Sequence, residues 1–578
     1  MKSFEELTGL IRGSEIGRSA PIGTPYGLRR ILYADLTASG RSLSFVEARI
    51  AELLPLYGNV HSPRSATGRA MSLAREEARR AVARGVNAGP DDVVVFVGSG
   101  ATAAVNKLVG VLGLRVPEPL EREFHLSHAI PAERRPVVLA GPYEHHSNEL
   151  PWLESIAELV EVELGADGAL DLDDLRLKAH AYRDRPLRIG AVSAASNVTG
   201  VLTDVPAVCK ILHGEGAIAC IDYAAAGPYV PIDMHPSDPR ERIDAVFLST
   251  HKLMGGPGAS GVLVANRSLF RSRVPERPGG GTVEYVGPQK SPCSSCGSAP
   301  LRVDYTSALV EREEGGTPNI LGDIRAGLVF ELRTLLGPAR ILEHDLKLAR
   351  WALARLASNP RIRLLGPSTG PRLPILSFNV DGLHHELVST LLDHLFGVQA
   401  RAGCSCAGPY GHRLLGIDAA RSERYRRLIH EGLLGAKPGW TRISIPYYAS
   451  SDDAAFLLSA VEAVADHGEA FVPLYRLSWR DGAWHQLWCA QPGPVGILED
   501  GSCLLSEKPA ARLETPQSDE DLARERRGAL EEAALRAAAL RAAWQRSPPE
   551  WNRPTGHREV DDLTWFRYVE TEGLTAGG

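Results

Sequence analysis

Two polar side chains that follow apolar stretches of this sequence have the chemistry of a reactive site. Asp222 ends the apolar run 217–222, and Lys252 follows the run 245–249 in a loop that continues Gly-Gly-Pro-Gly. Open α/β sheets place ligand groups at the carboxyl ends of their strands, so we expect this carboxylate and this amine at one sheet edge. Taken singly, Asp222 could equally cap the next turn, and most lysines are solvated surface residues.

A glycine turn upstream of them could hold a phosphate. The apolar run 93–97 leads into residues 98–103, Gly-Ser-Gly-Ala-Thr-Ala, and then into a helical pattern. Backbone N–H groups at the start of a helix bind phosphate. The turn also fits the dinucleotide pattern of a nicotinamide dehydrogenase, but that pattern needs a next strand ending in an acidic residue, and residues 140–141 are Ala-Gly.

Pyridoxal phosphate is the cofactor indicated by the glycine turn, the carboxylate and the amine taken together. The helix start would hold the phosphate, Asp222 would lie beside the pyridine nitrogen, and Lys252 would bind the aldehyde carbon. A dehydrogenase would leave Lys252 and Arg442 without a role.

The elements that position these groups are typical of an α/β fold. Between residues 33 and 270, short apolar runs alternate with Ala- and Leu-rich stretches of helical spacing. The predicted strands are 93–97, 136–140, 187–193, 217–222, 245–249 and 261–265. Nearly all are apolar throughout, so we expect both faces of the sheet to be covered.

The remaining chain predicts further parts. We expect an N-terminal segment (1–30), a large cofactor-binding domain (31–330), a smaller α/β domain (331–470) that follows helical patterns at 322–336 and 341–357, and a C-terminal extension (471–578).

Within the extension, a hairpin and a helix are predicted. Residues 475–480 and 483–488 flank Asp481-Gly482, which suits a type I′ turn. Ser518, with Asp521 three residues later, begins a charged helix reaching about Gln545. We expect this helix to be solvated and to pack through one leucine stripe.

Composition excludes several classes of protein. The 578 residues include 64 Lys and Arg against 70 Asp and Glu, a formal charge of −6 without a strongly charged block, so nucleic acid is not an expected partner. No apolar run reaches the roughly 20 residues that span a bilayer, so no membrane association is expected. The acidic N-terminus lacks the basic start of a signal peptide, which predicts a cytoplasmic protein.

Seven motifs in order resemble the class V aminotransferase family of fold type I pyridoxal-phosphate enzymes, and most closely its cysteine desulfurase and selenocysteine lyase branch. The resemblance covers about residues 33–450 and implies a large domain with a mainly parallel seven-stranded sheet, a smaller C-terminal α/β domain and a homodimer. The motifs are Gly98-Ser-Gly-Ala-Thr102, Glu144-His145-His146-Ser-Asn148 with Pro151-Trp152, Ser196-Asn197-Val-Thr-Gly200, Asp222-Tyr-Ala, Ser249-Thr-His251-Lys252, Gly316-Thr-Pro-Asn319 and Arg442-Ile-Ser444.

The resemblance also implies roles for single residues. Lys252 would hold the cofactor covalently and act in catalysis, Asp222 would pair with the ring nitrogen, His145 would stack on the ring as a catalytic residue, and Asn197 would contact the ring hydroxyl. Arg442 would bind the substrate carboxylate, which suits a bidentate guanidinium, unless it forms a surface ion pair. The residues implied at the phosphate are Ala101, Thr102, Ser249, His251 and, from the neighbouring subunit, Thr317.

The eight cysteines are too few for a disulfide scaffold, so each is considered as a thiol. By the resemblance, Cys406 falls on the catalytic cysteine of the desulfurases, where neighbouring glycines and a cationic cofactor could lower the pKa of its thiol. A buried structural cysteine is the alternative. Cys404 could accept or resolve a persulfide or be inert.

The other cysteines have weaker signals. Cys293 and Cys296 could be half of a zinc site, a redox pair or part of a loop, and only Cys404 and Cys406 could complete four ligands, so no metal is expected. The remaining four are expected in the core or in strands: Cys209, Cys220, Cys489 and Cys503.

The sequence therefore predicts a cysteine desulfurase-like enzyme. It would remove sulfur from L-cysteine, or a related thio or seleno amino acid, as a persulfide on Cys406, release alanine and pass the sulfur to an acceptor protein. Ala225 stands where the family usually has a glutamine against the ring oxygen, which could tune reactivity or signal another reaction. A C–S lyase, an aminotransferase or an epimerase on another amino acid, and a non-catalytic scaffold or regulatory dimer, remain alternatives.

Overall fold

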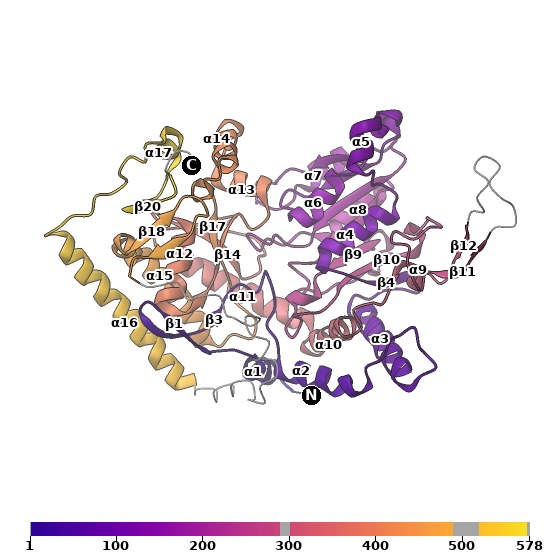
Figure 1. Cartoon of the computed structure of the whole chain (residues 1–578), viewed down its shortest axis with the longest axis horizontal. Coiled ribbons are helices and arrows are strands. Elements are labelled where there is room, and N and C mark those ends of the chain that lie inside the picture. Colours follow the sequence, from indigo (N-terminus) through magenta and orange to yellow (C-terminus); the bar gives the residue numbers. More distant parts are fainter. Residues whose placement is uncertain (1, 289–300, 489–518, 575–578) are drawn as a thin grey trace. The chain divides into compact units, whose positions relative to one another are not determined.

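The structure is a computed structural model that describes residues 2–288, 301–488 and 519–574 (Figure 1). The chain divides into two compact units. Unit 1 comprises Met1–Ser14, Leu36–Lys347 and Pro367–Leu373, and unit 2 comprises Glu15–Asp35, Leu348–Gly366 and Pro374–Gly578. The boundaries of the four predicted parts stay a prediction.

Unit 1 is built on a seven-stranded sheet of order β4-β10-β9-β8-β7-β5-β6. Strands β6, β5, β7, β8 and β9 lie side by side in this order and run parallel. Strand β10 is antiparallel to both β9 and β4. The strands are β4 (Asp92–Val97), β5 (Val137–Ala140), β6 (Glu158–Glu161), β7 (Arg188–Ser193), β8 (Ile218–Asp222), β9 (Ala245–Leu248) and β10 (Gly261–Asn266). The predicted α/β fold class is confirmed, and the six predicted strands agree with the structure to within one residue at each end.

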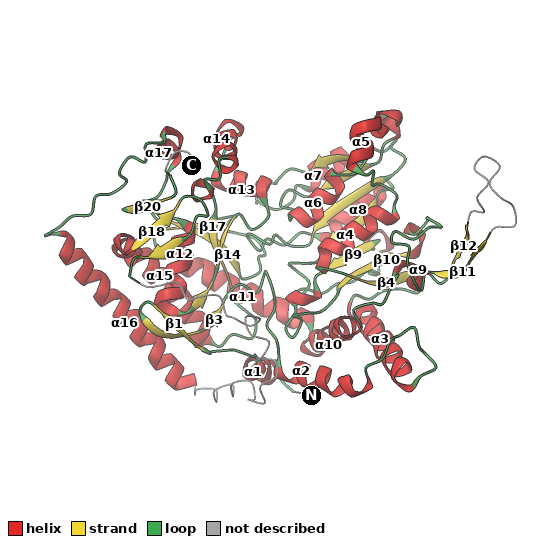
Figure 2. Ribbon diagram, in the orientation of Figure 1, coloured by secondary structure: helices red, strands yellow, loops and turns green. Residues whose placement is uncertain are grey.

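Both faces of this sheet are buried, as predicted. In β4 the successive residues Val94 and Val95, which point to opposite faces, are 4% and 0% exposed. Figure 2 shows the strands lying between helices. These are α3 (Ala66–Gly85), α4 (Gly100–Val111), α6 (His146–Leu153), α7 (Leu172–Ala181), α8 (Val205–Gly214) and α10 (Ile320–Leu336).

The structure adds a strand that the sequence did not predict. Edge strand β6 has only four residues, two of them glutamates, and none is fully buried. Without a continuous apolar run it lacks the signal that identified the other strands.

Unit 2 contains a four-stranded antiparallel sheet of order β13-β14-β17-β16, with β16 at one edge. Its strands are β13 (Ile362–Leu364), β14 (Ile375–Val380), β16 (Arg401–Gly403) and β17 (Trp440–Ser444), and its main helices are α12 (His385–Phe396) and α15 (Ser451–His467). The predicted helices at 322–336 and 341–357 are confirmed as α10 and as α11 (Pro338–Ala357).

The extension belongs to the same core as the rest of unit 2. It forms β18 (Tyr475–Ser478), β19 (Trp484–Gln486), α16 (Asp519–Trp544), α17 (Arg558–Leu563) and β20 (Glu570–Glu572). One buried cluster joins Trp484 and Phe566 of the extension to Leu387 of α12 and Leu458 of α15.

The predicted hairpin is confirmed, but the predicted type I′ turn is wrong. Leu477 pairs with Trp484, and the Ser478 N–H donates to the Ala483 carbonyl at 2.9 Å, so the loop spans residues 479–482. A type I′ turn needs a positive φ at both central residues, and of Asp481-Gly482 only the glycine has one (+78°). The wider loop lets Trp479 turn its indole fully into the core.

Helix α16 is confirmed, and its predicted leucine stripe is confirmed in part, because Leu530 and Leu540 are partly buried against the core. Its buried face consists of Leu522, Arg526 and alanines 529, 533 and 537, whereas Leu535 is 72% exposed. Small alanines allow α16 to lie close to its neighbours, and Arg526 is buried because it pairs with Asp453. The predicted cap at Ser518 lies outside the described residues.

Two cysteine predictions are confirmed: Cys209 of α8 and Cys220 of β8 are fully buried. Cys293, Cys296, Cys489 and Cys503 lie outside the described residues. Within the described ranges, no helix is long and apolar enough to cross a membrane. The same residues contain no group of three or more His, Cys, Asp or Glu side chains that could hold a metal ion.

Candidate active site

The carboxyl edge of the unit 1 sheet brings Asp222 and Lys252 together. Asp222 is the last residue of β8, and Lys252 ends the 3-10 turn Thr250–Lys252 that directly follows β9, the neighbouring parallel strand. Burial raises the pKa of Asp222 to about 6, opposed by the Ala224 N–H, which donates to the carboxylate at 2.7 Å, and by the positive charge of Lys252. A buried carboxylate therefore faces a half-buried amine, in the arrangement that the sequence predicted.

The glycine turn after β4 lies against the same loop. The Ala101 N–H donates to Ser249 Oγ at 2.9 Å. Gly100 has a φ of +57°, and a Cβ there would lie 2.7 Å from His251 Cε1 and 2.8 Å from Ser249 Oγ, so the turn requires glycine. Ala101, Ser249 and His251 thus meet where α4 begins, and Thr102 follows on its first turn. Burial, with the charge of Lys252, lowers the pKa of His251 to about 4, so its imidazole is neutral.

His145 is held by its own hydrogen bonds. It is the N-cap of α6, where its Nδ1 accepts from the Ser147 N–H at 3.1 Å. The Ser147 hydroxyl lies 2.7 Å from Thr102 Oγ1 and 3.0 Å from His145 Nδ1. This fixes the imidazole relative to the start of α4 and leaves Nε2 to bear the ring proton.

Glu144 connects this histidine to the sheet, a role that the sequence did not reveal. Its carboxyl accepts from the Ser193 N–H (2.8 Å), the Ser193 hydroxyl (2.6 Å) and Asn148 Nδ2 (2.7 Å). Ser193 ends β7 and pairs in register with Asp222. Burial raises the pKa of Glu144 to about 8 despite these donors, and the charge of Asp222 adds to the rise. Its place in a motif was a signal, but only the fold shows that the side chain points into the core.

Two further predicted cofactor contacts lie in unit 1. Asn197 is 5% exposed in the segment that follows β7. Thr317 is exposed, and its Oγ1 accepts from Asn59 Nδ2 at 3.1 Å. Ala225, at the position of the usual glutamine, is buried.

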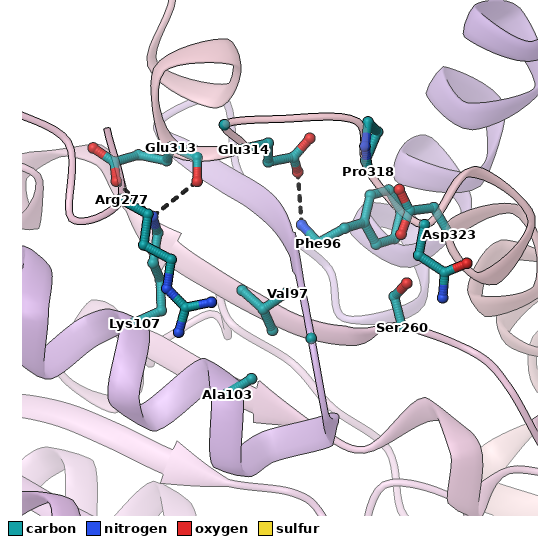
Figure 3. Close-up of a pocket in the computed structure, with 13 residues that line it drawn as sticks. Phe96, Val97, Ala103, Lys107, Ser260, Arg277, Glu313, Glu314, Pro318 and Asp323 are labelled. Carbon is teal, nitrogen blue, oxygen red and sulfur yellow. Dashed lines mark hydrogen bonds and ion pairs between the residues drawn. The ribbon is translucent and has the colours of Figure 1, made fainter. Parts of the chain in front are cut away.

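Buried charges join the segment before Thr317 to the glycine turn (Figure 3). Glu314 accepts from the Phe96 N–H at 2.7 Å and pairs with Arg79 at 3.0 Å. Lys107 of α4 pairs with Glu313 at 2.8 Å. Glu313, Glu314 and Lys107 line a cavity of about 180 Å³ that Gly98 also lines. Strand β4, helix α4 and the loop with Thr317 are therefore fixed to one another.

In unit 2, Arg442 forms a buried ion pair instead of the surface pair considered as an alternative. It lies in β17, is 2% exposed, and its guanidinium donates to Asp35 Oδ1 at 2.7 Å. Asp35 is 407 positions earlier in the chain, so no local pattern could have identified it.

Cys406 of unit 2 is a half-buried free thiol two residues before α13 (Gly408–Leu415). Ser405 and Cys406 have φ values of +49° and +55°, and Gly403 has +102°. A non-glycine residue in the left-handed region costs on the order of 1 kcal/mol or more and persists only where its surroundings enforce it. Such strain is common at functional sites. Cys404, two positions earlier, is also a half-buried free thiol.

The unit 1 residues fit pyridoxal phosphate. The N–H groups at the start of the twelve-residue helix α4 and the Ser249 hydroxyl are donors for a phosphate, next to a backbone that only glycine can adopt. Buried Asp222 has lost hydration that a protonated ring nitrogen would replace, and Lys252 offers a primary amine.

Comparisons with known proteins point the same way. The family model for class V aminotransferases matches residues 32–457. A cysteine desulfurase of Pectobacterium atrosepticum is 30% identical over 387 residues, covering 66% of this chain and 84% of the relative. A probable cysteine desulfurase of Halalkalibacterium halodurans is 28% identical over 400 residues, covering 68% and 88%.

Solved structures are similar too. The apo cysteine desulfurase of Thermococcus onnurineus NA1 has a TM-score of 0.58 and 26% identity, covering 75% of this chain and 95% of that one. The cysteine desulfurase CsdA of Escherichia coli has a TM-score of 0.56 and 25% identity, covering 75% and 94%. The extension from residue 471 onward lies beyond the family match.

Proposed function

Because the chain belongs to the class V aminotransferase family, we propose that it is a pyridoxal-phosphate-dependent cysteine desulfurase that converts L-cysteine to alanine and holds the sulfur as a persulfide on Cys406. The observation that supports this most is the meeting of Asp222, Lys252 and the glycine turn at one sheet edge. A half-buried free thiol at the desulfurase position supports the specific reaction.

The cofactor of this family is pyridoxal phosphate, and the residues that would hold it are those of the unit 1 sheet edge. Asp222 would pair with the ring nitrogen, Lys252 would bind covalently, and His145 and Asn197 would contact the ring. The phosphate would be held by Ala101, Thr102, Ser249 and His251. When bound, the cofactor supplies an electron-withdrawing ring that takes up the electron pair left when the substrate loses its α-proton.

The chain's own groups then have defined tasks. The Arg442 guanidinium binds the substrate carboxylate, and Asp35 holds the guanidinium in place. Lys252 Nζ takes the α-proton of L-cysteine and later returns a proton to carbon. The Cys406 thiolate attacks the substrate sulfur, so that the S–S bond forms as the C–S bond breaks. Alanine leaves, and a thiol of the acceptor removes the persulfide sulfur.

The proposal includes a homodimer and an acceptor protein. Exposed Thr317 is available to a neighbouring subunit, and buried ion pairs fix its loop, as a contact to that subunit's phosphate requires. A cytoplasmic location is part of the proposal because persulfide chemistry needs reduced thiols.

The test is to identify the carbon product. Purified protein with pyridoxal phosphate is incubated with L-cysteine and a thiol reductant, as wild type, Cys406→Ser and the matched control Cys404→Ser. Alanine and sulfide from wild type and control, without sulfide from Cys406→Ser, are expected. Buried Ala225 favours one second candidate, a C–S lyase, because the ring oxygen lacks its usual donor. Pyruvate and ammonia, with sulfide release insensitive to Cys406→Ser, would establish that reaction instead.

A further inference from the structure

We propose that the C-terminal extension is a positioning device for the loop of Cys406. Aromatic side chains of the extension fix the buried pair His384–His385, and His385 fixes the backbone at Gly403, where that loop begins. The inference rests on the proposed role of Cys406 as the nucleophile.

The loop needs support that its own strand does not provide. Strand β16, which leads into it, has three residues and, among the strands that the structure describes, pairs only with β17, at the edge of its sheet. Ser405 and Cys406 are nevertheless both in the left-handed region. A strained conformation after a short edge strand persists only where packing from outside the strand enforces it.

His385 provides that packing on one side. Gly439 lies close to both this histidine and the end of β16. A Cβ at position 439 would come within 2.7 Å of His385 Nε2 and within 2.9 Å of Gly403 Cα. The Thr441 hydroxyl donates to the His385 carbonyl at 3.0 Å, and Thr441 pairs with Ala402 of β16. The histidine is thus fastened to β17, and both its ring and Gly403, the last residue of β16, lie next to Gly439.

The extension holds the histidines from the other side. The Trp565 ring is stacked on His385 with planes 3° apart and centroids 6.2 Å apart. Phe566 meets His384 edge-on at 4.5 Å, and Trp484 Nε1 donates to His384 Nδ1 at 3.1 Å. The two histidine rings are themselves 4.2 Å apart.

These contacts depend on packing and not on charge. Burial lowers the pKa of both histidines, that of His385 to about 3, so both rings are neutral. All three aromatic residues lie beyond residue 457, where the family match ends. The motifs therefore lie inside the family match, while one wall of the nucleophile's support lies beyond it.

The experiment uses the full-length holoenzyme and two readouts. Hydrogen exchange of the peptide covering residues 400–407 reports the loop itself, and kcat and KM for L-cysteine report its use. Trp565→Ala removes the stacking ring, and Trp565→Phe restores an aromatic ring. Trp544→Ala is the matched control, because Trp544 packs on Trp551 within the same extension.

In Trp565→Ala we expect exchange at 400–407 to accelerate and kcat to fall by about tenfold, since displacing a reacting group by around 1 Å costs up to about 100-fold. KM and the cofactor absorbance stay unchanged, Trp565→Phe recovers most of both readouts, and Trp544→Ala matches wild type. If Trp565→Ala does not fold, Trp484→Phe, which keeps a buried aromatic ring but removes the N–H donated to His384 and part of the indole, is expected to show a smaller change in the same direction.

Unchanged exchange in folded Trp565→Ala, equal effects of Trp565→Ala and Trp544→Ala, or no recovery with Trp565→Phe would each overturn the inference. Faster exchange with unchanged kcat would also overturn it. Sulfide release that survives Cys406→Ser would instead refute the proposed function, whatever the Trp565 variants do.

Discussion

Replacing Glu144 by glutamine should remove a loss of stability that the wild type shows as pH rises. Burial raises the pKa of Glu144 from 4.5 to about 8. A pKa higher in the folded than in the unfolded chain means that ionisation destabilises the fold, so stability falls as pH rises from about 4.5 to about 8. Each pKa unit corresponds to about 1.4 kcal/mol, so this single group accounts for a fall of up to about 5 kcal/mol.

Glu144→Gln keeps the shape and removes the titration. At pH 5.5, where Glu144 is protonated, the variant should be less stable by about 1–3 kcal/mol, because its amide must meet the donors Asn148 and Ser193. At pH 8.5 the wild type should be the less stable of the two proteins, since only the wild type then buries an ionised carboxylate at position 144.

The assay is urea unfolding of both proteins, free of cofactor, at pH 5.5, 7 and 8.5. The raised pKa of Asp222 also makes the free energy of unfolding depend on pH, but it does so in both proteins, so its contribution cancels in the difference between them. Glu118→Gln, on the surface of α5 (Glu118–Phe124), is the matched control and should leave the difference near zero at every pH. A constant difference between wild type and Glu144→Gln across the range would refute the reasoning.

Three further changes have defined outcomes. Burial alone would raise the pKa of Asp453, but the charges of Arg526 and Arg18 outweigh it and lower the pKa to about 2. Asp453→Asn should therefore lower the free energy of unfolding by about 2 kcal/mol in urea unfolding at pH 7. This loss should shrink as pH falls from about 4 towards 2, where the wild-type carboxylate becomes protonated. Arg442→Lys should raise KM for L-cysteine by about tenfold or more with little change in kcat, because a fork of charge-assisted hydrogen bonds is replaced by a point charge; an unchanged KM would remove Arg442 from the substrate site. Lys252→Ala should abolish alanine formation, and borohydride should fix the cofactor on the peptide of Lys252 in wild type but on no peptide of the variant.

The sequence predicted the unit 1 sheet well because its strands are buried on both faces. A run such as 245–249, apolar throughout and ended by a polar residue, is recognisable without knowledge of its neighbours. Edge strand β6 has no such run and was missed. The same local logic predicted that Asp222 and Lys252 lie at one sheet edge, since each stands at or just after the carboxyl end of an apolar strand.

Interactions between distant parts of the chain could not be predicted. Asp35 reaches Arg442 across 407 positions, and Glu144 gains its three donors only when β7 and α6 meet. The hairpin turn was mispredicted because Asp481-Gly482 favours a tight turn locally, while burial of Trp479 requires a wider loop. In each case tertiary packing outweighed a local preference.

The way the extension is built also determines how its role can be studied. Ala533 of α16, Trp484 and Phe566 belong to the same buried cluster as Leu387 of α12 and Leu458 of α15. Truncating the chain before Leu474 would therefore expose the core of unit 2, and loss of activity would not separate positioning from unfolding. Substituting Trp565, which is only partly buried against this cluster, removes one ring and leaves the buried members of the cluster in place, so it tests the extension's effect on Cys406 directly.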